Sequence, residues 1–369
     1  MPRAPKKVDR PYLIAVIILT IIGIFVFSSA SLGLMVRGGE TFSDLIFSQF
    51  LLGLGGGVIA LVSLINIPYR SYRNLAPHMF GVALFLTALV FLPVIGVEAN
   101  GARRWLNVFG VSFQPAEFLK ISFVLALAWY YSVYYRKMNS IQFSLGGLCA
   151  GLGLIALILL LQPDTGTLLI IAATGGAIDM GAGVQFRHLA VLGSVLMVAV
   201  ILLVLMRPYL LERVKTLIDP MGDPDASYQI KQSLIGIGSG GWFGRGYGQG
   251  VQKFKYLPEP SSDSIFSVAA EEFGFLGSVV FVLLYTFLAV RGLYIASWAP
   301  DRFGGLTVIG IVILIATQSF LNIGSVVGLV PFTGEPLTFI SHGGTSLLFT
   351  FIGVGIVLNV SRYRTVRRR

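Results

Sequence analysis

The feature that most constrains this chain is a series of apolar blocks, each near the length that crosses a membrane as a helix. About 20 helical residues span the hydrocarbon layer of a bilayer. Hydrophobic residues make up 55% of the 369-residue chain and charged residues only 12%, and this charged share is about half that of an ordinary soluble domain. We therefore predict an all-α, polytopic integral membrane protein with about ten transmembrane helices. The predicted spans are residues 12–34, 43–67, 77–97, 113–133, 143–161, 165–183, 188–208, 264–289, 304–328 and 344–361.

The positions of Lys and Arg predict how these helices are oriented. Cytoplasmic loops of membrane proteins are enriched in basic residues, and ten crossings place both termini on the same side. That side holds Arg3, Lys6, Lys7, Arg10, Arg70, Arg73, Arg136, Lys137, Arg187, Arg291, Arg302, Arg362, Arg364, Arg367, Arg368 and Arg369. The short loops of the other side hold only Arg37, Arg103 and Arg104. We expect cytoplasmic termini, and we interpret the net charge of +10 as topology and not as a nucleic-acid surface.

One long connection, residues 209–263, follows the seventh predicted span. It is too rich in glycine and too mixed in polarity to be a span, and long loops translocate regardless of charge, so we predict that it is extracytoplasmic. Residues 236–241 match the pattern G-x-G-x-x-G, but no predicted strand precedes them, which argues against a dinucleotide site. Aromatic residues favour a packed lid over disorder: Tyr228, Trp242, Phe243, Tyr247, Phe254 and Tyr256. We see no internal repeat and predict one domain over residues 1–369.

Unusual polar residues gather on the predicted outer side, where we expect Asp263 and the charged pair of the fourth span to meet in one lipid-accessible cavity. Glu117 and Lys120 lie three positions apart on one face of the fourth span and can pair, either as a structural ion pair or as substrate contacts. Asp164 lies in the outer turn between spans five and six, as a helix cap or a substrate contact. Asp263 closes the long loop where two prolines stiffen the chain, and it is either another cap or a catalytic carboxylate.

A second outer loop, residues 331–346, mixes turn formers with aromatic residues. Non-helical backbone near membrane depth is tolerated only inside protein or along a cavity, so we expect this loop to wall the same outer cavity. His342 in this loop is either a proton shuttle or a hydrogen-bonded structural residue. His78 and His188 lie in predicted cytoplasmic loops, so the three histidines cannot form one metal site.

Motifs along nearly the whole chain resemble those of the SEDS family, which is named for shape, elongation, division and sporulation. The matching segments, in family order, are Asn100–Trp105, Gln114–Lys120, Gln162–Thr167, Tyr228–Ser233, Gly244–Gly246, Tyr256–Asp263 and Pro331–Ser346. Two positions depart from the family pattern, which usually has an apolar residue at Glu335 and tyrosine at His342. The departures concern the detail of the second outer loop.

The resemblance implies a glycosyltransferase that polymerises lipid II into peptidoglycan at the outer face of the bacterial cytoplasmic membrane. It implies a class B penicillin-binding protein and the elongation machinery as partners, and grooves open to membrane lipid for the polyprenyl tails. The family's essential loop aspartate corresponds to Asp263, which we expect to be the general base, and its paired charges correspond to Glu117 and Lys120. Substrate-binding or supporting residues are expected at Arg103, Arg104, Trp105, Asp164, Arg213, Lys215, Arg245, Glu259, Ser341 and His342. A divalent cation, Mg or Mn, would help the pyrophosphate to leave.

Two other functions fit the same features. A lipid II flippase also has about ten helices, buried charges and a cavity, although carriers commonly show internal repeats and sites near the midplane. A non-catalytic scaffold that positions the penicillin-binding protein is the second alternative. Within the family, the short N-terminal tail and compact loops favour the elongation-specific member, RodA.

Overall fold

The computed structural model describes residues 7–37, 47–99, 102–108, 111–219 and 227–364. Arg3, Lys6, Asn100, Gly101 and the tail arginines 367–369, which entered the predictions above, lie outside these ranges. The helices are α1 Arg10–Arg37, η1 Phe47–Gly56, α3 Gly57–Asn66, α4 Arg70–Leu89, α5 Pro115–Tyr134, η2 Tyr135–Lys137, α6 Ile141–Leu161, α7 Thr165–Ala182, α8 Phe186–Met206, α9 Pro208–Ile218, α10 Tyr228–Ser239, α11 Gln252–Lys255, α12 Ile265–Ser297, α13 Arg302–Val326 and α14 Gly344–Ser361. Strands β1 Gly96–Ala99, β2 Ala102–Val108 and β3 Val111–Phe113 complete the fold.

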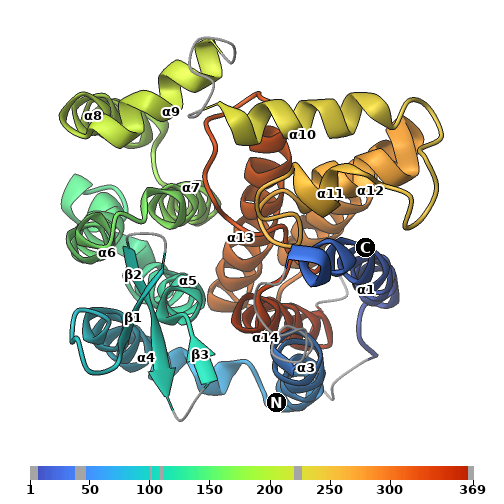
Figure 1. Ribbon diagram of the computed structural model, residues 1–369. Coiled ribbons are helices and arrows are strands. Elements are labelled where there is room, and N and C mark those ends of the chain that lie inside the picture. The colour runs from blue at the N-terminus through green and yellow to red at the C-terminus, as the bar shows by residue number, and fades with distance from the viewer. Residues whose placement is uncertain (1–6, 38–46, 100–101, 109–110, 220–226, 365–369) are drawn as a thin grey trace.

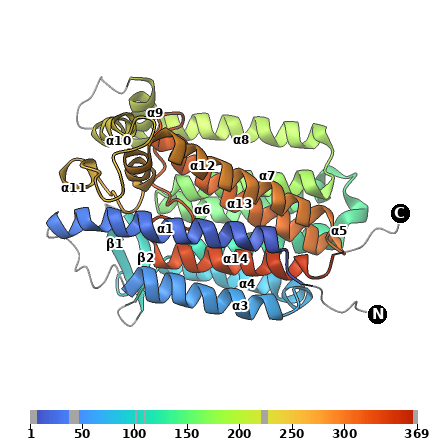
Figure 2. The ribbon, with the colours of Figure 1, turned by 90° about the vertical axis from the view of Figure 1, so that its right-hand side faces the viewer.

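The predicted helical membrane fold is confirmed. Within the described ranges, nine helices are long and apolar enough to cross a membrane, with η1 and α3 acting as one span. The more polar α4 has 20 residues, which makes it about 30 Å long, and it packs along α5. Counted with α4, the helices agree with the predicted number of crossings. Asp9 before α1 pairs with Arg291 of α12 and with Arg364 after α14, so the first helix begins where the last one ends (Figure 2).

The bundle is arranged around α14 and α13 (Figure 1). Of the most apolar window of α14, 89% is buried inside the protein, against 6% for α8 at the edge of the bundle. A helix that is apolar on all sides is stable only inside a larger core or in lipid. Small residues let α14 approach its neighbours closely: a side chain on Gly355 would lie 3.1 Å from the Cα atom of Leu61 in α3.

A small antiparallel sheet, in the order β1-β2-β3, was missed by the sequence analysis. The third span, predicted at 77–97, was wrong at both ends, because α4 begins at Arg70 and ends at Leu89. The apolar residues that follow form turns and enter β1. A Cβ atom on Gly96 would lie 2.0 Å from the carbonyl oxygen of Val90, so this tight return of the chain requires glycine. Hydropathy alone does not reveal such a turn.

The connection 209–263 contains more regular structure than predicted. α10 packs on α12 and α13, and α11 packs on α1, whereas α9 has no buried residue. Together with the sheet, these helices lie at the end of the bundle away from the start of α1 (Figure 2). We call this the loop end of the bundle.

The span predicted at 264–289 is also different, because α12 extends to Ser297 and its backbone leaves the helical conformation at Gly274, where φ is 68° and ψ is −165°. The loop 241–246 fills this break by taking the place of the missing helical partners. Four backbone hydrogen bonds do so: Arg245 N to Glu271 O at 3.0 Å, Gly246 N to Glu272 O at 3.0 Å, Phe275 N to Gly241 O at 2.8 Å and Leu276 N to Trp242 O at 3.2 Å. Unpaired backbone groups at a helix break are costly, so the loop and the break stabilise each other.

This arrangement predicts that Gly244→Ala destabilises the protein more than Gly248→Ala. Both glycines have positive φ, 82° and 78°, so alanine costs about 1–2 kcal/mol at either position. Only at Gly244 would the new Cβ also overlap a backbone atom, the carbonyl oxygen of Glu272 at 2.1 Å; at Gly248 it meets nothing within 4 Å. Thermal unfolding of the purified variants in detergent measures the difference. Equal melting temperatures would contradict the role of the loop at the helix break.

Candidate functional site

Asp263 lies in the turn between α11 and α12, at the loop end of the bundle. The carbonyl oxygens of three consecutive residues there are each held by a donor from the segment 335–342 or from α13. The bonds are His342 N to Ser261 O at 2.7 Å, Ser341 Oγ to Ser262 O at 2.6 Å and Asn322 Nδ2 to Asp263 O at 2.9 Å. The backbone that carries Asp263 is therefore fixed at successive points.

The side chain of Asp263 is not the cap of α12, because Ser264 occupies the N-cap position. Its Oδ1 atom accepts a hydrogen bond of 3.0 Å from Ser262 Oγ. Its Oδ2 atom would lie 3.6 Å from a Cβ atom on Gly334, where φ is 73°. A glycine at this position leaves room beside the carboxylate.

The surroundings of Asp263 raise the pKa of its carboxyl group towards neutral pH. Burial raises the pKa of Asp263 to about 6, Glu259 adds to the rise, and the Ser262 hydroxyl, Arg104 and Arg213 oppose it. Glu259 is exposed, and its carbonyl oxygen accepts the backbone N–H groups of the turn that leads into α12. A carboxylate with a pKa just below 7 is well suited to accept a proton.

Two predicted cationic residues, Arg104 and Arg213, lie close enough to lower the pKa of this carboxyl group. Arg104 in β2 donates from Nε to the carbonyl oxygen of Gln162 at 3.3 Å and also bonds the carbonyl of Pro163, so the sheet is tied to the turn between α6 and α7. Arg213 in α9 lies over the ring of Tyr209, 5.9 Å from its centroid. Burial lowers the pKa of Arg213, but a guanidinium remains charged at neutral pH.

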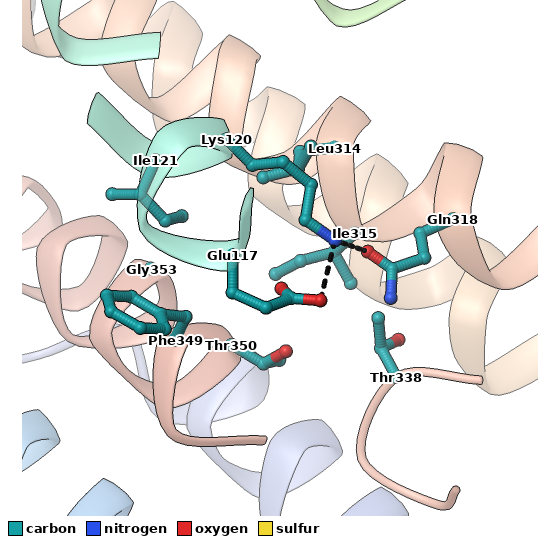
Figure 3. A pocket seen from close by; sticks show the side chains of 10 residues that line it. All are labelled: Glu117, Lys120, Ile121, Leu314, Ile315, Gln318, Thr338, Phe349, Thr350 and Gly353. Carbon is teal, nitrogen blue, oxygen red and sulfur yellow. Dashed lines mark hydrogen bonds and ion pairs between the residues drawn. The ribbon is translucent and has the colours of Figure 1, made fainter. Parts of the chain in front are cut away.

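A buried charge cluster lies next to this site (Figure 3). Lys120 Nζ is 2.9 Å from Glu117 Oε1, 2.8 Å from Gln318 Oε1 and 3.8 Å from Glu335 Oε2. The side chains of Lys120 and Glu117 are 2% and 5% exposed, so the pair faces protein and locks α5 to α13. This geometry favours the structural interpretation of the pair.

Asp164 and Glu335 share the hydroxyl group of Thr167. Asp164 caps α7, accepting from Thr167 N at 3.3 Å. Thr167 Oγ1 lies 2.9 Å from Asp164 Oδ2 and 2.7 Å from Glu335 Oε1. One hydroxyl carries one proton, so the second contact needs a proton on a carboxyl group. Burial raises the pKa of Glu335 and the charge of Lys120 opposes the rise; a protonated Glu335 would supply that hydrogen.

Asn322 connects the turn that holds Asp263 to the loop that holds Glu335. Its Nδ2 atom donates to Asp263 O and, at 2.7 Å, to Glu335 O. The cavity beside the charge cluster measures about 10 Å³, room for about one water molecule, and Asp263 is not among the described residues that line it. We expected one pocket around Asp263 and the Glu117–Lys120 pair; among the described residues, Asp263 does not share this cavity with the pair, and the two are connected through Asn322 and Glu335.

The ring of His342 is packed against an aromatic side chain. Its ring stacks on Phe27 with centroids 5.9 Å apart and an interplanar angle of 17°. Burial lowers the pKa of His342 to about 4, so the ring is neutral at pH 7. Its backbone N–H, and not its ring, reaches the Asp263 turn. The stacking favours a structural role over the proton shuttle, but in the described part of the chain the buried ring Nε2 atom has no hydrogen-bond partner.

The described contacts of the remaining predicted residues are with other groups than Asp263. Arg103 pairs with Glu98 at 3.2 Å, and Trp105 follows on the same face of β2, whereas Arg104 and the buried Leu106 share the other face. Arg245 pairs with Glu271 at 3.5 Å near the break of α12, and Lys215 is exposed. In the part of the chain that the structure describes, no three His, Cys, Asp or Glu side chains gather to hold a metal ion.

Sequence reasoning missed Gln318, Asn322 and Thr167, which connect the site. Gln318 and Asn322 are four residues apart in an apolar span, so they share a helix face, and both are buried. A polar amide inside a span is costly unless it is hydrogen-bonded. This spacing is the signal that would have found them.

The charge cluster predicts that Lys120→Met strongly destabilises the protein, by about 3–5 kcal/mol, because the Glu117 carboxylate is left buried and unpaired. The double variant Lys120→Met with Glu117→Gln removes both charges and should recover much of the melting temperature. Thermal unfolding in detergent measures both. If Lys120→Met instead kept full stability while glycan polymerisation was lost, Lys120 would be a substrate contact.

Comparisons with known proteins cover nearly the whole chain. A family model described as a cell cycle protein and named for FtsW, RodA and SpoVE matches residues 10–366. Stage V sporulation protein E of Bacillus subtilis is 38% identical over 366 residues, which cover 97% of this chain and 98% of that protein. A probable peptidoglycan glycosyltransferase FtsW of a Geobacter species is 36% identical, with the same coverage of both chains.

Solved structures agree with this relationship. The crystal structure of rod shape determining protein RodA from Thermus thermophilus is similar with a TM-score of 0.70 and 27% identity, covering 97% of each chain. A chain from a structure described as the structural coordination of polymerization and crosslinking by a peptidoglycan synthase complex has a TM-score of 0.73 and 29% identity, covering 97% of this chain and 98% of its own. By its motifs, its helical membrane fold and these similarities, the chain belongs to the FtsW, RodA and SpoVE family of cell cycle proteins.

Proposed function

We propose that this protein polymerises lipid II into glycan strands at the outer face of the bacterial cytoplasmic membrane, with Asp263 as general base. The chain is a peptidoglycan glycosyltransferase, the activity for which its full-length relatives are named. One observation carries the assignment of the base. Asp263 has a backbone held at three successive carbonyls, a pKa raised to about 6 and two arginines close enough to limit that rise.

The proposed step joins the C4 hydroxyl of N-acetylglucosamine in lipid II to the anomeric carbon of a growing glycan. The bond from the anomeric carbon to pyrophosphate breaks as the new glycosidic bond forms, and the hydroxyl proton passes to Asp263. An α-linked donor and a β-linked product require in-line attack with inversion. Arg104 and Arg213 would offset the charge of the departing undecaprenyl pyrophosphate. A divalent cation stays a prediction, and no step here depends on it.

Asp263→Asn keeps the size of the side chain but removes the base, and Asp263→Ala removes the whole group. We expect both variants to insert and fold normally and to lose glycan polymerisation by at least about 100-fold, the scale of general base catalysis. Purified protein mixed with labelled lipid II, with polymer resolved by gel electrophoresis, measures this loss.

The same assay separates the alternatives. Wild-type protein that moves lipid II across sealed vesicles without making polymer would be a flippase, and protein that does neither would be a scaffold. Polymer formed at the normal rate by Asp263→Asn would remove Asp263 from the mechanism.

The pKa of Asp263 predicts the pH dependence of the reaction. A general base must be ionised, so kcat/KM should fall as the pH drops through about 6, approaching tenfold per pH unit below it. Arg213 lowers the pKa of Asp263, so Arg213→Met should move this acid limb to higher pH. Initial rates between about pH 5 and 8 test both statements. A flat profile over this range would be incompatible with Asp263 as the base.

The orientation, partner and cellular role are further parts of the proposal. The Lys and Arg distribution supports cytoplasmic termini, and the similarity to a chain of a peptidoglycan synthase complex supports a class B penicillin-binding protein as partner. An elongation role rests on the compact loops, whereas relatives named FtsW and SpoVE make division and sporulation the alternatives. Depletion that produces filaments in place of rounded cells would favour division.

A further inference from the structure

Gln49 is a buried amide in the second span that the proposed chemistry does not use. It lies in η1, a π-helix whose buried residues are Gln49 and Gly53. η1 packs closely on the start of α14, since a Cβ on Gly53 would lie 3.1 Å from Gly344 Cα. π-helical segments are rare and frequently occur at functional sites. Gln49 is 5% exposed, so its amide needs partners within the protein.

Both ends of the Gln49 amide bind the backbone on either side of His342. Nε2 donates to the carbonyl oxygen of Ser341 at 3.2 Å, and Oε1 accepts from the N–H of Gly343 at 3.0 Å. A primary amide offers a donor and an acceptor side by side. The clamped residues in turn hold the Asp263 turn, through His342 N to Ser261 O and Ser341 Oγ to Ser262 O.

We propose that Gln49 is a positioning residue for Asp263. It acts through the segment Ser341–Gly343, although Gln49 and Asp263 are more than two hundred residues apart in the sequence. This segment is non-helical. Ser341 is bonded to Leu337 through its N–H and its hydroxyl group, but the Ser341 carbonyl and the Gly343 N–H are held by Gln49. Without the amide, Ser341 O and Gly343 N lose partners inside the protein and the segment shifts. A displacement of about 1 Å at a catalytic group can cost about 100-fold in rate. The inference rests on the proposed role of Asp263.

The decisive variant is Gln49→Met, which keeps the length of the side chain and removes the amide. We expect kcat for glycan polymerisation to fall about tenfold or more, with KM within about twofold of wild type. The acid limb of the pH profile should also move, because the surroundings of Asp263 change. Leu51→Ala, on the exposed side of the same π-helix with 61% of Leu51 exposed, is the matched control and should keep the wild-type rate.

Gln49→Glu gives a second, independent signature. In its protonated form, the carboxyl group of this variant can donate to Ser341 O and accept from Gly343 N, whereas the ionised carboxylate cannot donate. The rate of Gln49→Glu relative to wild type should therefore decline as the pH rises. This variant also tests the inference if Gln49→Met fails to fold.

Three outcomes would overturn the inference: an unchanged kcat and pH profile for Gln49→Met, a loss explained entirely by less folded protein, or a pH-independent ratio for Gln49→Glu. Asp263→Asn in the same assay separates the two proposals. If it is inactive while Gln49→Met is normal, only the positioning role fails. If Asp263→Asn is active, the proposed function fails first.

Discussion

The structure depends on the requirement that polar groups inside an apolar bundle find partners within the protein. The Nδ2 atom of Asn322 supplies such partners to two loops at once, because it donates to both Asp263 O and Glu335 O. It thereby joins the end of the connection 209–263 to the loop before α14. The turn that carries Asp263 owes its place to this bond and to its neighbours from Ser341 and His342.

Buried charges follow the same rule in two places. Lys120 with Glu117 connects α5 to α13, while Lys253 in α11 lies 2.6 Å from Glu272 in α12 and 2.6 Å from Ser29 in α1. Both pairs are buried and hydrogen-bonded, so each holds helices together at the loop end. Desolvation makes such pairs weak contributors to net stability, yet breaking one is costly. Their main effect is therefore to determine which helices pack together, and they add little to the stability of the bundle.

The break in α12 links the loop end to the membrane span. Before Gly274 the helix is packed inside protein and follows the turn that holds Asp263. After Gly274, the large side chains of Phe275 and Leu276 are exposed, as expected for contact with lipid. The loop 241–246 supplies the hydrogen bonds that the broken helix lacks. A change of direction is thus possible without unpaired backbone groups, and Asp263 can stand at the protein interior while the same helix continues through the membrane.

The sequence by itself determined the membrane fold and the approximate spans, because hydropathy is a local property of the chain. It also made Asp263, Glu117 and Lys120 candidates for the site. It did not reveal the sheet, the break at Gly274 or the early end of α4, since turns within apolar segments have no distinct hydropathy. Only the tertiary structure decided that Arg104 and Arg213 lie close enough to Asp263 to lower its pKa, and that Gln49 and Asn322 support its turn. These outcomes depend on contacts between residues far apart in sequence, and such contacts form only when the helices pack.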